Sequence, residues 1–236
     1  MVNTKLLKSD AENLGISLTE EQISLFEKLS ELLVEQNKTM NLTAITDPDG
    51  IAVKHFADSV SVLSAFDFAN GAKVLDVGTG AGFPSIPLLI ARPDLDMTMI
   101  DSTAKKLKYV ASTVESLGLT AEVLHTRAEE AGQNKAYREK FDIVCSRAVA
   151  ALNVLCEYCL PFVKVGGVFL AMKGAKAQEE IDGAKAAIKL LGGEIIDEKS
   201  FTLSDGGERT IVVIKKISHV PPKYPRVSAQ IAKKPL

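Results

Sequence analysis

The sequence predicts a doubly wound α/β domain, in which a mostly parallel sheet is covered by helices on both faces. From residue 73 onward, short apolar segments alternate with helical stretches. Segments that are apolar on both faces and separated by helices are typical of a parallel sheet buried on both sides. A glycine-rich loop also follows the first of these segments and leads directly into a helix, which is the order found in nucleotide-binding folds of this class.

Residues 1–70 are predicted to form a helical extension in front of the sheet. Residues 19–38 begin with a Thr-x-x-Gln capping box and then carry apolar side chains at helical spacing, namely Ile23, Phe26, Leu29 and Leu33. A second helix is expected at about 48–65, with Asp47 as its N-cap and Pro48 in its first turn. Both helices have an apolar face that needs a partner.

Residues 71–217 are predicted to form the α/β domain itself. Its expected strands are residues 73–77, 97–101, 121–125, 141–146 and 168–172. A helix at 176–191 follows, and then the segments 194–203 and 209–216 flank the glycine-rich turn SDGGE. This arrangement predicts that the sheet ends in an antiparallel hairpin.

Residues 218–236 are predicted to form a basic, extended tail. From residue 209 to the end there are seven Lys or Arg residues and no acid, and four of the nine prolines lie between 221 and 235. Proline-rich segments favour extended backbone, and a local run of cations suits a polyanionic partner.

Composition excludes several classes of protein. The chain has 236 residues, 46% of them hydrophobic, which is enough to bury a core and argues against disorder. The formal net charge is only −2, so a nucleic-acid partner would have to be met by a local patch. No apolar run approaches the roughly 18 residues that a membrane span requires, and the N-terminus lacks the pattern of a signal peptide. We therefore expect a cytoplasmic protein.

The three cysteines do not indicate a disulfide framework or a metal site. Cys156 and Cys159 form a C-x-x-C pair, but the three histidines are scattered without metal-ligand spacing. Buried thiols that pack on a helix are the preferred interpretation, and Cys145 is expected in the core because it lies within a strand. No bound metal is expected.

The strongest motif is the loop at residues 76–84, Asp-Val-Gly-Thr-Gly-Ala-Gly-Phe-Pro. Gly78, Gly80 and Gly82 allow a sharp turn and a close approach of a ligand to the backbone. Asp101 ends the next strand, 19 residues after Gly82, where a carboxylate can accept hydrogen bonds from both hydroxyls of a ribose. A turn with an unrelated acid at a strand end is the alternative, but strand, loop, helix and acid all occur in the required order.

The spacing G-x-G-x-G differs from the G-x-G-x-x-G of dinucleotide binders. Asp76 also stands two residues before the first glycine, where a carboxylate would repel a pyrophosphate but suits the sulfonium and amino groups of S-adenosylmethionine. The pattern D-x-G-x-G-x-G resembles motif I of the class I methyltransferases, whose last strand also runs antiparallel. We therefore favour S-adenosylmethionine over NAD as the cofactor.

Several other segments of the sequence make the resemblance more specific than motif I alone. They are MNLTAI at 40–45, KHFADS at 54–59, DVGTGAGFPSIPLLI at 76–90, DSTAKK at 101–106, RAEE at 127–130, SRAVA at 146–150, MKG at 172–174 and RTIVVIKK at 209–216, with YPR and a final KKPL in the tail. Over nearly the whole chain the sequence resembles the RsmG family, also called GidB, bacterial enzymes that methylate N7 of a guanine in 16S ribosomal RNA. The stretch VSAQIA between YPR and KKPL departs from the family's usual Gly-x-Pro pattern.

The resemblance implies a class I S-adenosylmethionine-dependent methyltransferase (Rossmann-like) sheet and a set of cofactor contacts. The contacts carried over from the family are Gly78, Phe83, Asp101, Ala128, Glu129 and Arg147, and the loop itself adds Asp76, Gly80 and Gly82 as cofactor-binding residues. Arg147 follows the fourth strand, where substrate meets cofactor in this fold, and is the candidate catalytic residue. The alternatives are a capped helix start for Glu129 and a structural ion pair for Arg147. His55 would either stack near the site or pack between helices, with Asp58 orienting it.

Guanine N7 carries a lone pair and no proton, so methyl transfer to it needs no general base. The expected RNA-binding cations are Arg127, Lys173, Arg209 and Arg226, together with the tail. Arg127, Arg147 and Lys173 each follow a strand and would gather on one rim of the sheet.

The partner would be 16S ribosomal RNA or a small ribosomal subunit during assembly, with the enzyme acting as a monomer. The alternatives are a methyltransferase of a small molecule or protein, an NAD-binding oxidoreductase and a non-catalytic adenosine-binding module.

Overall fold

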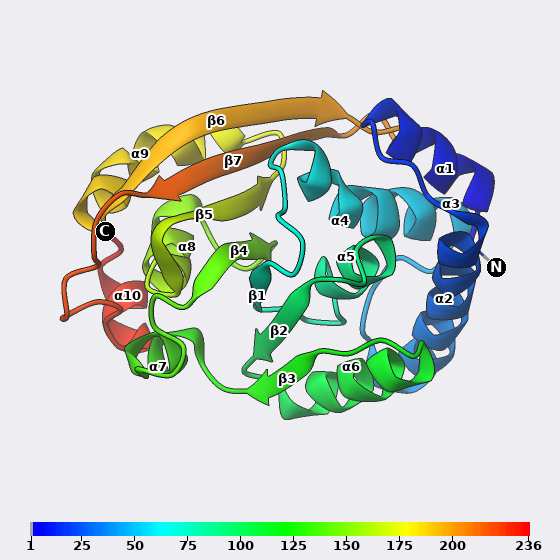
Figure 1. The fold of residues 1–236 in the computed structure, drawn as a ribbon, viewed down its shortest axis with the longest axis horizontal. Helices are drawn as coiled ribbons and strands as arrows, with labels where there is room; N and C mark the ends of the chain where they lie inside the picture. Colours follow the sequence, from blue (N-terminus) through cyan, green and yellow to red (C-terminus); the bar gives the residue numbers. More distant parts are fainter. Residues whose placement is uncertain (1) are drawn as a thin grey trace.

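The computed structural model describes residues 2–236 and contains one mixed seven-stranded sheet (Figure 1). The strand order is β3-β2-β1-β4-β5-β7-β6, and the first five strands in the chain run parallel. The strands are β1 (Lys73–Val77), β2 (Asp96–Asp101), β3 (Glu122–His125), β4 (Phe141–Arg147), β5 (Val163–Lys173), β6 (Gly193–Thr202) and β7 (Glu208–Lys216). Each predicted strand is present, so the predicted doubly wound α/β fold is confirmed.

The sheet is buried on both faces because alternate residues of its strands enter two separate cores. Val74 of β1 packs in the core that contains the N-terminal helices, whereas the next residue, Leu75, packs in the core formed with the later helices. The first core includes α5 (Ser85–Ala91) and α6 (Ala104–Ser116). The second includes α7 (Ala128–Gln133), α8 (Leu152–Cys159) and α9 (Ala177–Leu190). Strands that carry apolar residues on both faces are what this two-sided burial requires.

The N-terminal helices pack directly on the first face of the sheet. Helix α1 (Thr4–Asn13) precedes α2 (Glu20–Met40), whose predicted capping box between Thr19 and Gln22 is confirmed. All four apolar residues that the spacing placed on one face of α2 are buried. They join the same core as the strand residues, so this segment covers the sheet.

The second predicted helix is confirmed, but its winding changes along its length. Asp47 caps the start by accepting the Gly50 N–H at 2.7 Å, as predicted. The chain then forms α3 (Pro48–Gly50), the π-helix η1 (Ile51–Ala57), α4 (Asp58–Val60) and the 3₁₀-helix η2 (Ser61–Ser64). Short π-helical turns are rare and frequently occur at functional sites. This one carries Lys54 and His55, which face the cavities described below.

The predicted antiparallel hairpin at the end of the sheet is also confirmed. Strand β7 pairs antiparallel with both β5 and β6, so it lies between them. The hairpin turn at 203–207 contains Gly206 with φ +73°, a conformation that glycine adopts at little cost. Because β7 runs against β5, the first residues of β7 lie beside the carboxyl end of β5, and Arg209 is brought next to Lys173 and its neighbours.

The prediction of an extended tail is wrong for residues 228–233, which form the short helix α10 (Ser228–Lys233). Tyr224 and Ile231 are buried, and Arg226 forms an ion pair with Glu157 of α8. The tail therefore packs across α7 and α8 (Figure 1). The physical reason is the buried Glu157 carboxylate, which requires a cation and receives it from the tail.

The cysteines are buried, as expected of packing thiols. Burial raises the pKa of Cys156 and Cys159, because both thiols project from α8 into the apolar core. Among residues 2–236, no three metal-ligating side chains lie close enough together to hold an ion. No helix within the same range is long and apolar enough to cross a membrane.

Candidate active site

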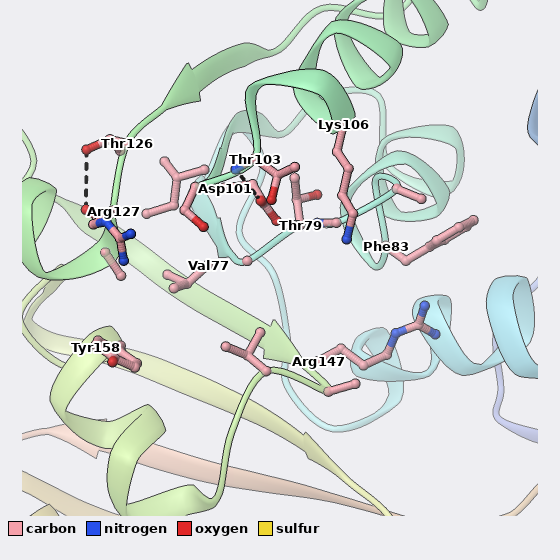
Figure 2. Close-up of a pocket in the computed structure, with 18 of the residues that line it drawn as sticks. Val77, Thr79, Phe83, Asp101, Thr103, Lys106, Thr126, Arg127, Arg147 and Tyr158 are labelled. Atoms are coloured by element: carbon pink, nitrogen blue, oxygen red, sulfur yellow. Dashed lines mark hydrogen bonds between the residues drawn. The ribbon is translucent and has the colours of Figure 1, made fainter. Parts of the chain in front are cut away.

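The main cavity lies at the carboxyl ends of the parallel strands and has a volume of about 580 Å³ (Figure 2). Its walls come from the segments that follow β1, β2, β3 and β4, with Leu42 and Thr43 from the N-terminal region closing one side. Open α/β sheets bind ligands at this edge because the strand ends diverge there. We refer to this space as the cofactor cavity.

The loop after β1 forms the floor of the cofactor cavity. Gly78, Gly80 and Gly82 all have positive φ, at +78°, +58° and +91°. A Cβ at Gly78 would lie 2.5 Å from a methyl group of Val149, and one at Gly82 would collide with Ile86. A Cβ at Gly80 would meet nothing closer than a backbone oxygen at 4.0 Å, so the space above Gly80 belongs to the cavity. The loop thus needs all three glycines, and only Gly80 leaves room for a ligand.

Asp101 is fixed at the end of β2 beside this loop. Its Oδ2 accepts the Gly80 N–H at 3.0 Å, and its Oδ1 accepts the Thr103 N–H at 2.8 Å. A carboxylate has about four acceptor positions, so two remain for a ligand. Vicinal hydroxyls of a ribose have the geometry to use them, and Asp101 lines the cofactor cavity as that role requires.

Asp76 lies beneath the loop, outside the lining of the cofactor cavity. It is fully buried, and the Ser85 hydroxyl donates a hydrogen bond to its Oδ2, while Oδ1 has no partner among the described residues. Burial raises the pKa of Asp76 to about 7, against the hydrogen bond from Ser85. The sequence predicted direct contact with a cationic ligand, but the structure places this carboxylate where it supports the loop and contributes charge from below.

Ala128 and Glu129 begin α7 and line the opposite side of the cofactor cavity. Glu129 lies in the first turn of this helix, where a carboxylate is favourably placed near the helix N-terminus, so the structure contains the helix start considered as an alternative. Arg127 is the N-cap residue, and its side chain is 59% exposed at the rim. Figure 2 shows Arg127 and Tyr158 on this side of the cavity, facing Val77 and Asp101.

An aromatic stack separates the cofactor cavity from the N-terminal helices. The His55 and Phe83 rings are 4.7 Å apart and nearly parallel, and the Arg147 guanidinium lies 5.3 Å from the Phe83 ring centre. Nε2 of His55 is 2.8 Å from the Thr43 hydroxyl. Burial and the nearby charge of Arg147 lower the pKa of His55 to about 4, so the imidazole is neutral at physiological pH. His55 does stack near the site, but Asp58 does not orient it.

Asp58 instead links two arginines across the rim. Its Oδ2 accepts a hydrogen bond from Arg147 at 2.7 Å, and its Oδ1 accepts one from Nε of Arg209 at 3.0 Å. Arg209 also pairs with Asp205 at 3.2 Å. Arg147 therefore forms the ion pair that was considered as its alternative role, and it lines the cofactor cavity as well.

Most of the predicted RNA-binding cations are paired with acids within the protein. Lys173 has a side chain only 6% exposed and pairs with Glu180 at 2.7 Å. Arg226 pairs with Glu157 in the tail, outside the lining of the cofactor cavity. Only Arg127 extends its side chain substantially into solvent. Glu157 lies 69 residues from Arg226 and Asp58 lies 151 residues from Arg209, so these two pairings could not be read from local sequence.

Other cavity residues carried no prediction. Thr43 comes from the segment MNLTAI and Lys106 from DSTAKK, and both segments had been singled out without a role for these side chains. Tyr158 of α8 and Ser228 of α10 also line the cofactor cavity. Their positions depend on how α8 and the tail pack, and no motif signals that.

Comparison with solved structures defines the class of protein. The fold is similar to TYW2 of M. jannaschii, solved in complex with AdoMet, with 16% identity, a TM-score of 0.50 and coverage of 65% of this chain and 73% of that one. It is also similar to TrmN from Thermus thermophilus, with 16% identity, a TM-score of 0.53 and coverage of 67% of this chain and 48% of that one. The fold is that of the class I S-adenosylmethionine-dependent methyltransferases, as predicted, and S-adenosylmethionine is the cofactor of this class.

Sequence comparison then defines the family. The profile described as "GidB: rRNA small subunit methyltransferase G" matches residues 22–212. The ribosomal RNA small subunit methyltransferase G of Lactobacillus acidophilus is 48% identical and covers 94% of each chain. The protein of the same name from Lactobacillus johnsonii is also 48% identical and covers 100% of each chain. The chain belongs to the GidB family, as the resemblance of its motifs predicted.

Proposed function

We propose that this protein transfers a methyl group from S-adenosylmethionine to N7 of a guanine in 16S ribosomal RNA. The observation that carries the proposal is the structure of the cofactor cavity. In it, the Asp101 carboxylate accepts the Gly80 N–H at 3.0 Å, next to open space that a side chain at position 80 would fill. Full-length relatives at 48% identity, named for methylation of small-subunit ribosomal RNA, support this RNA as the substrate.

The residues present fit S-adenosylmethionine. Asp101 would accept hydrogen bonds from the ribose hydroxyls, Ala128 and Glu129 would contact the adenine, and the loop at 78–82 would lie against the methionine part. When bound, this cofactor supplies a methyl group on a positively charged sulfur. The buried Asp76 beneath the loop adds a compensating negative charge once it is ionised.

The protein's contribution to catalysis is alignment, exclusion of water and electrostatics. N7 of guanine attacks through an existing lone pair, so no side chain has to remove a proton. His55 is neutral and stacked on Phe83, which makes it part of the apolar wall. Arg147 is held over the same ring by Asp58 and lines the cofactor cavity, where its charge would act on the reacting groups.

We expect the rate of methyl transfer to be independent of pH. At saturating cofactor and RNA, the logarithm of the single-turnover rate should stay flat between about pH 6.5 and about 8.5, whereas general-base catalysis would give a unit slope. The affinity for S-adenosylmethionine should rise as the pH passes about 7, because Asp76 then becomes negatively charged beneath the loop. In Asp76→Asn that rise in affinity should disappear. A unit-slope rate profile abolished by one substitution would contradict the mechanism.

Arg147→Ala should lower the single-turnover rate at saturating RNA and cofactor by on the order of 100-fold, as is typical when a fixed charge at the reacting centre is removed. The matched control is Arg92→Ala, which removes an arginine that pairs with Asp94 and lines no described cavity. Transfer of tritiated methyl groups to small subunits from a strain lacking the enzyme provides the assay. An unchanged rate in Arg147→Ala would leave this arginine with a structural role only.

The partner and setting form part of the same proposal. The enzyme would act in the cytoplasm, as a monomer, on 16S ribosomal RNA within the small subunit or one of its assembly intermediates. Arg127, exposed at the rim of the cofactor cavity, is the cation best placed to meet an RNA phosphate. Comparing naked 16S RNA, assembly intermediates and complete subunits as methyl acceptors would identify the substrate.

A further inference from the structure

A second cavity, of about 590 Å³, opens directly beside the cofactor cavity. Four residues line both spaces, namely His55, Arg147, Ala148 and Val149. These shared residues mark the junction through which a group in one cavity meets a group in the other. Lys173 and Glu180 line the second cavity but not the cofactor cavity, so they belong to the part of the second cavity outside the shared lining.

The apolar and charged residues that line the second cavity suit the binding of a planar base. Val149 is a large apolar side chain that is 42% exposed, and Met172 also lines this cavity. The charged residues of the lining are two carboxylates, Asp58 and Glu180, and four cations, Lys54, Arg147, Lys173 and Arg209. Apolar walls suit the faces of a base, and a cationic excess suits its phosphate.

Glu180 is held in one orientation and keeps an oxygen available. Its Oε2 accepts the Leu152 N–H at 2.8 Å and pairs with Lys173 at 2.7 Å. Lys173 is fixed in turn by donating to the Ala150 carbonyl at 2.7 Å. All the contacts that the described residues make to this carboxylate use Oε2, and the side chain is 28% exposed where it lines the second cavity. Oε1 therefore offers up to two acceptor positions to a ligand.

We propose that the second cavity receives the acceptor guanine and that Glu180 determines specificity for it. This inference rests on the proposed function, because it assumes that N7 faces the cofactor cavity. With N7 at the junction, the N1–H and the 2-amino group point toward the opposite wall. Those two donors are what Oε1 of Glu180 can accept, as in other enzymes that read the Watson–Crick edge of an extruded base.

The same carboxylate disfavours adenine. Adenine presents an unprotonated N1 and no 2-amino group at this edge, so it would place a lone pair against a negatively charged oxygen. Inosine keeps the N1–H but lacks the 2-amino donor. One well-placed pair of hydrogen bonds gives about 5- to 150-fold discrimination between bases. The expected order of affinity is guanine, then hypoxanthine, then adenine.

The test uses Glu180→Gln, which keeps an oxygen for the Leu152 N–H but can present an amide donor to the base. The matched control is Glu179→Gln on the same helix, which makes the same change of charge at an exposed position outside both cavities. Methyl transfer to unmethylated small subunits is measured for wild type and both variants, with cofactor affinity measured by calorimetry. Binding of GMP, IMP and AMP to the wild type with S-adenosylhomocysteine bound is followed by ligand-observed NMR, which needs no variant to fold.

The inference predicts that Glu180→Gln lowers kcat/KM by about 10- to 100-fold with cofactor affinity unchanged, while Glu179→Gln behaves as wild type. GMP should bind the wild type better than IMP, and IMP better than AMP. Equal activity in both variants, or equal or absent binding of the three nucleotides, would overturn the role of Glu180. If the wild type itself failed to methylate small subunits, the proposed function would fall instead.

Discussion

Gly80→Leu is expected to abolish measurable binding of S-adenosylmethionine while the protein stays folded. Gly80 lines the cofactor cavity, and a Cβ there would meet no protein atom closer than 4.0 Å, so a longer side chain would occupy the space that the cofactor needs. We expect the affinity measured by calorimetry to fall by at least about 100-fold, or about 2.7 kcal/mol. Gly80 is a sharper test than Gly78, whose substitution would first displace Val149.

The control for Gly80→Leu is Gly118→Leu. Gly118 has φ +67°, close to the +58° of Gly80, and a Cβ there would also meet nothing within 4 Å, but this residue is exposed and lines no described cavity. Both substitutions force a non-glycine residue into left-handed backbone, at about 1–2 kcal/mol each. Equal stability losses with loss of cofactor binding in Gly80→Leu alone would isolate the steric effect. Normal cofactor affinity in Gly80→Leu would show that the cofactor binds elsewhere.

The sheet could be predicted in detail because its physics is local. In β1, for example, Val74, Leu75 and Val77 are apolar and buried, and apolar residues on both faces are typical of buried parallel strands. The hairpin was predictable because the glycine-rich turn SDGGE separates the segments 194–203 and 209–216. The π-helix η1 was not, because its sequence has ordinary helical periodicity and no motif marks the change in winding.

In the candidate site, too, the features that depend on local sequence were predicted, and those that depend on long-range packing were not. The glycine loop, Asp101 and the Ala128–Glu129 pair were found because each follows a strand, and parallel strands bring their ends together. The charge pairing was missed because it is long-range. Asp58 lies 89 residues from Arg147 and 151 residues from Arg209, and no local pattern connects the three side chains.

The tail shows that a count of basic residues does not by itself identify a nucleic-acid-binding segment. Its cations suggested RNA binding, yet Arg226 is already paired with Glu157, an acid on α8 whose side chain is fully buried. Gln133 of α7 also donates to the Pro225 carbonyl at 2.9 Å, and Asn153 of α8 donates to the Leu236 carbonyl at 2.9 Å. Residues 218–236 thus act as a strap across α7 and α8, and through Ser228 they reach the cofactor cavity.

Arg226→Ala is therefore expected to cause a large loss of stability. Glu157 accepts three hydrogen bonds from Arg226, from the backbone N–H at 2.9 Å, Nε at 2.8 Å and Nη2 at 2.6 Å. Removing the side chain would leave a fully buried carboxylate without its cation, which typically costs about 3–5 kcal/mol.

Urea unfolding should show this loss for Arg226→Ala as a lower midpoint. The double variant Arg226→Met with Glu157→Leu should recover most of it, because neither charge then remains buried. The salt dependence of RNA binding should be unchanged in the double variant, since this arginine is already paired within the protein. A weaker salt dependence together with wild-type stability would show that Arg226 leaves Glu157 to bind phosphate.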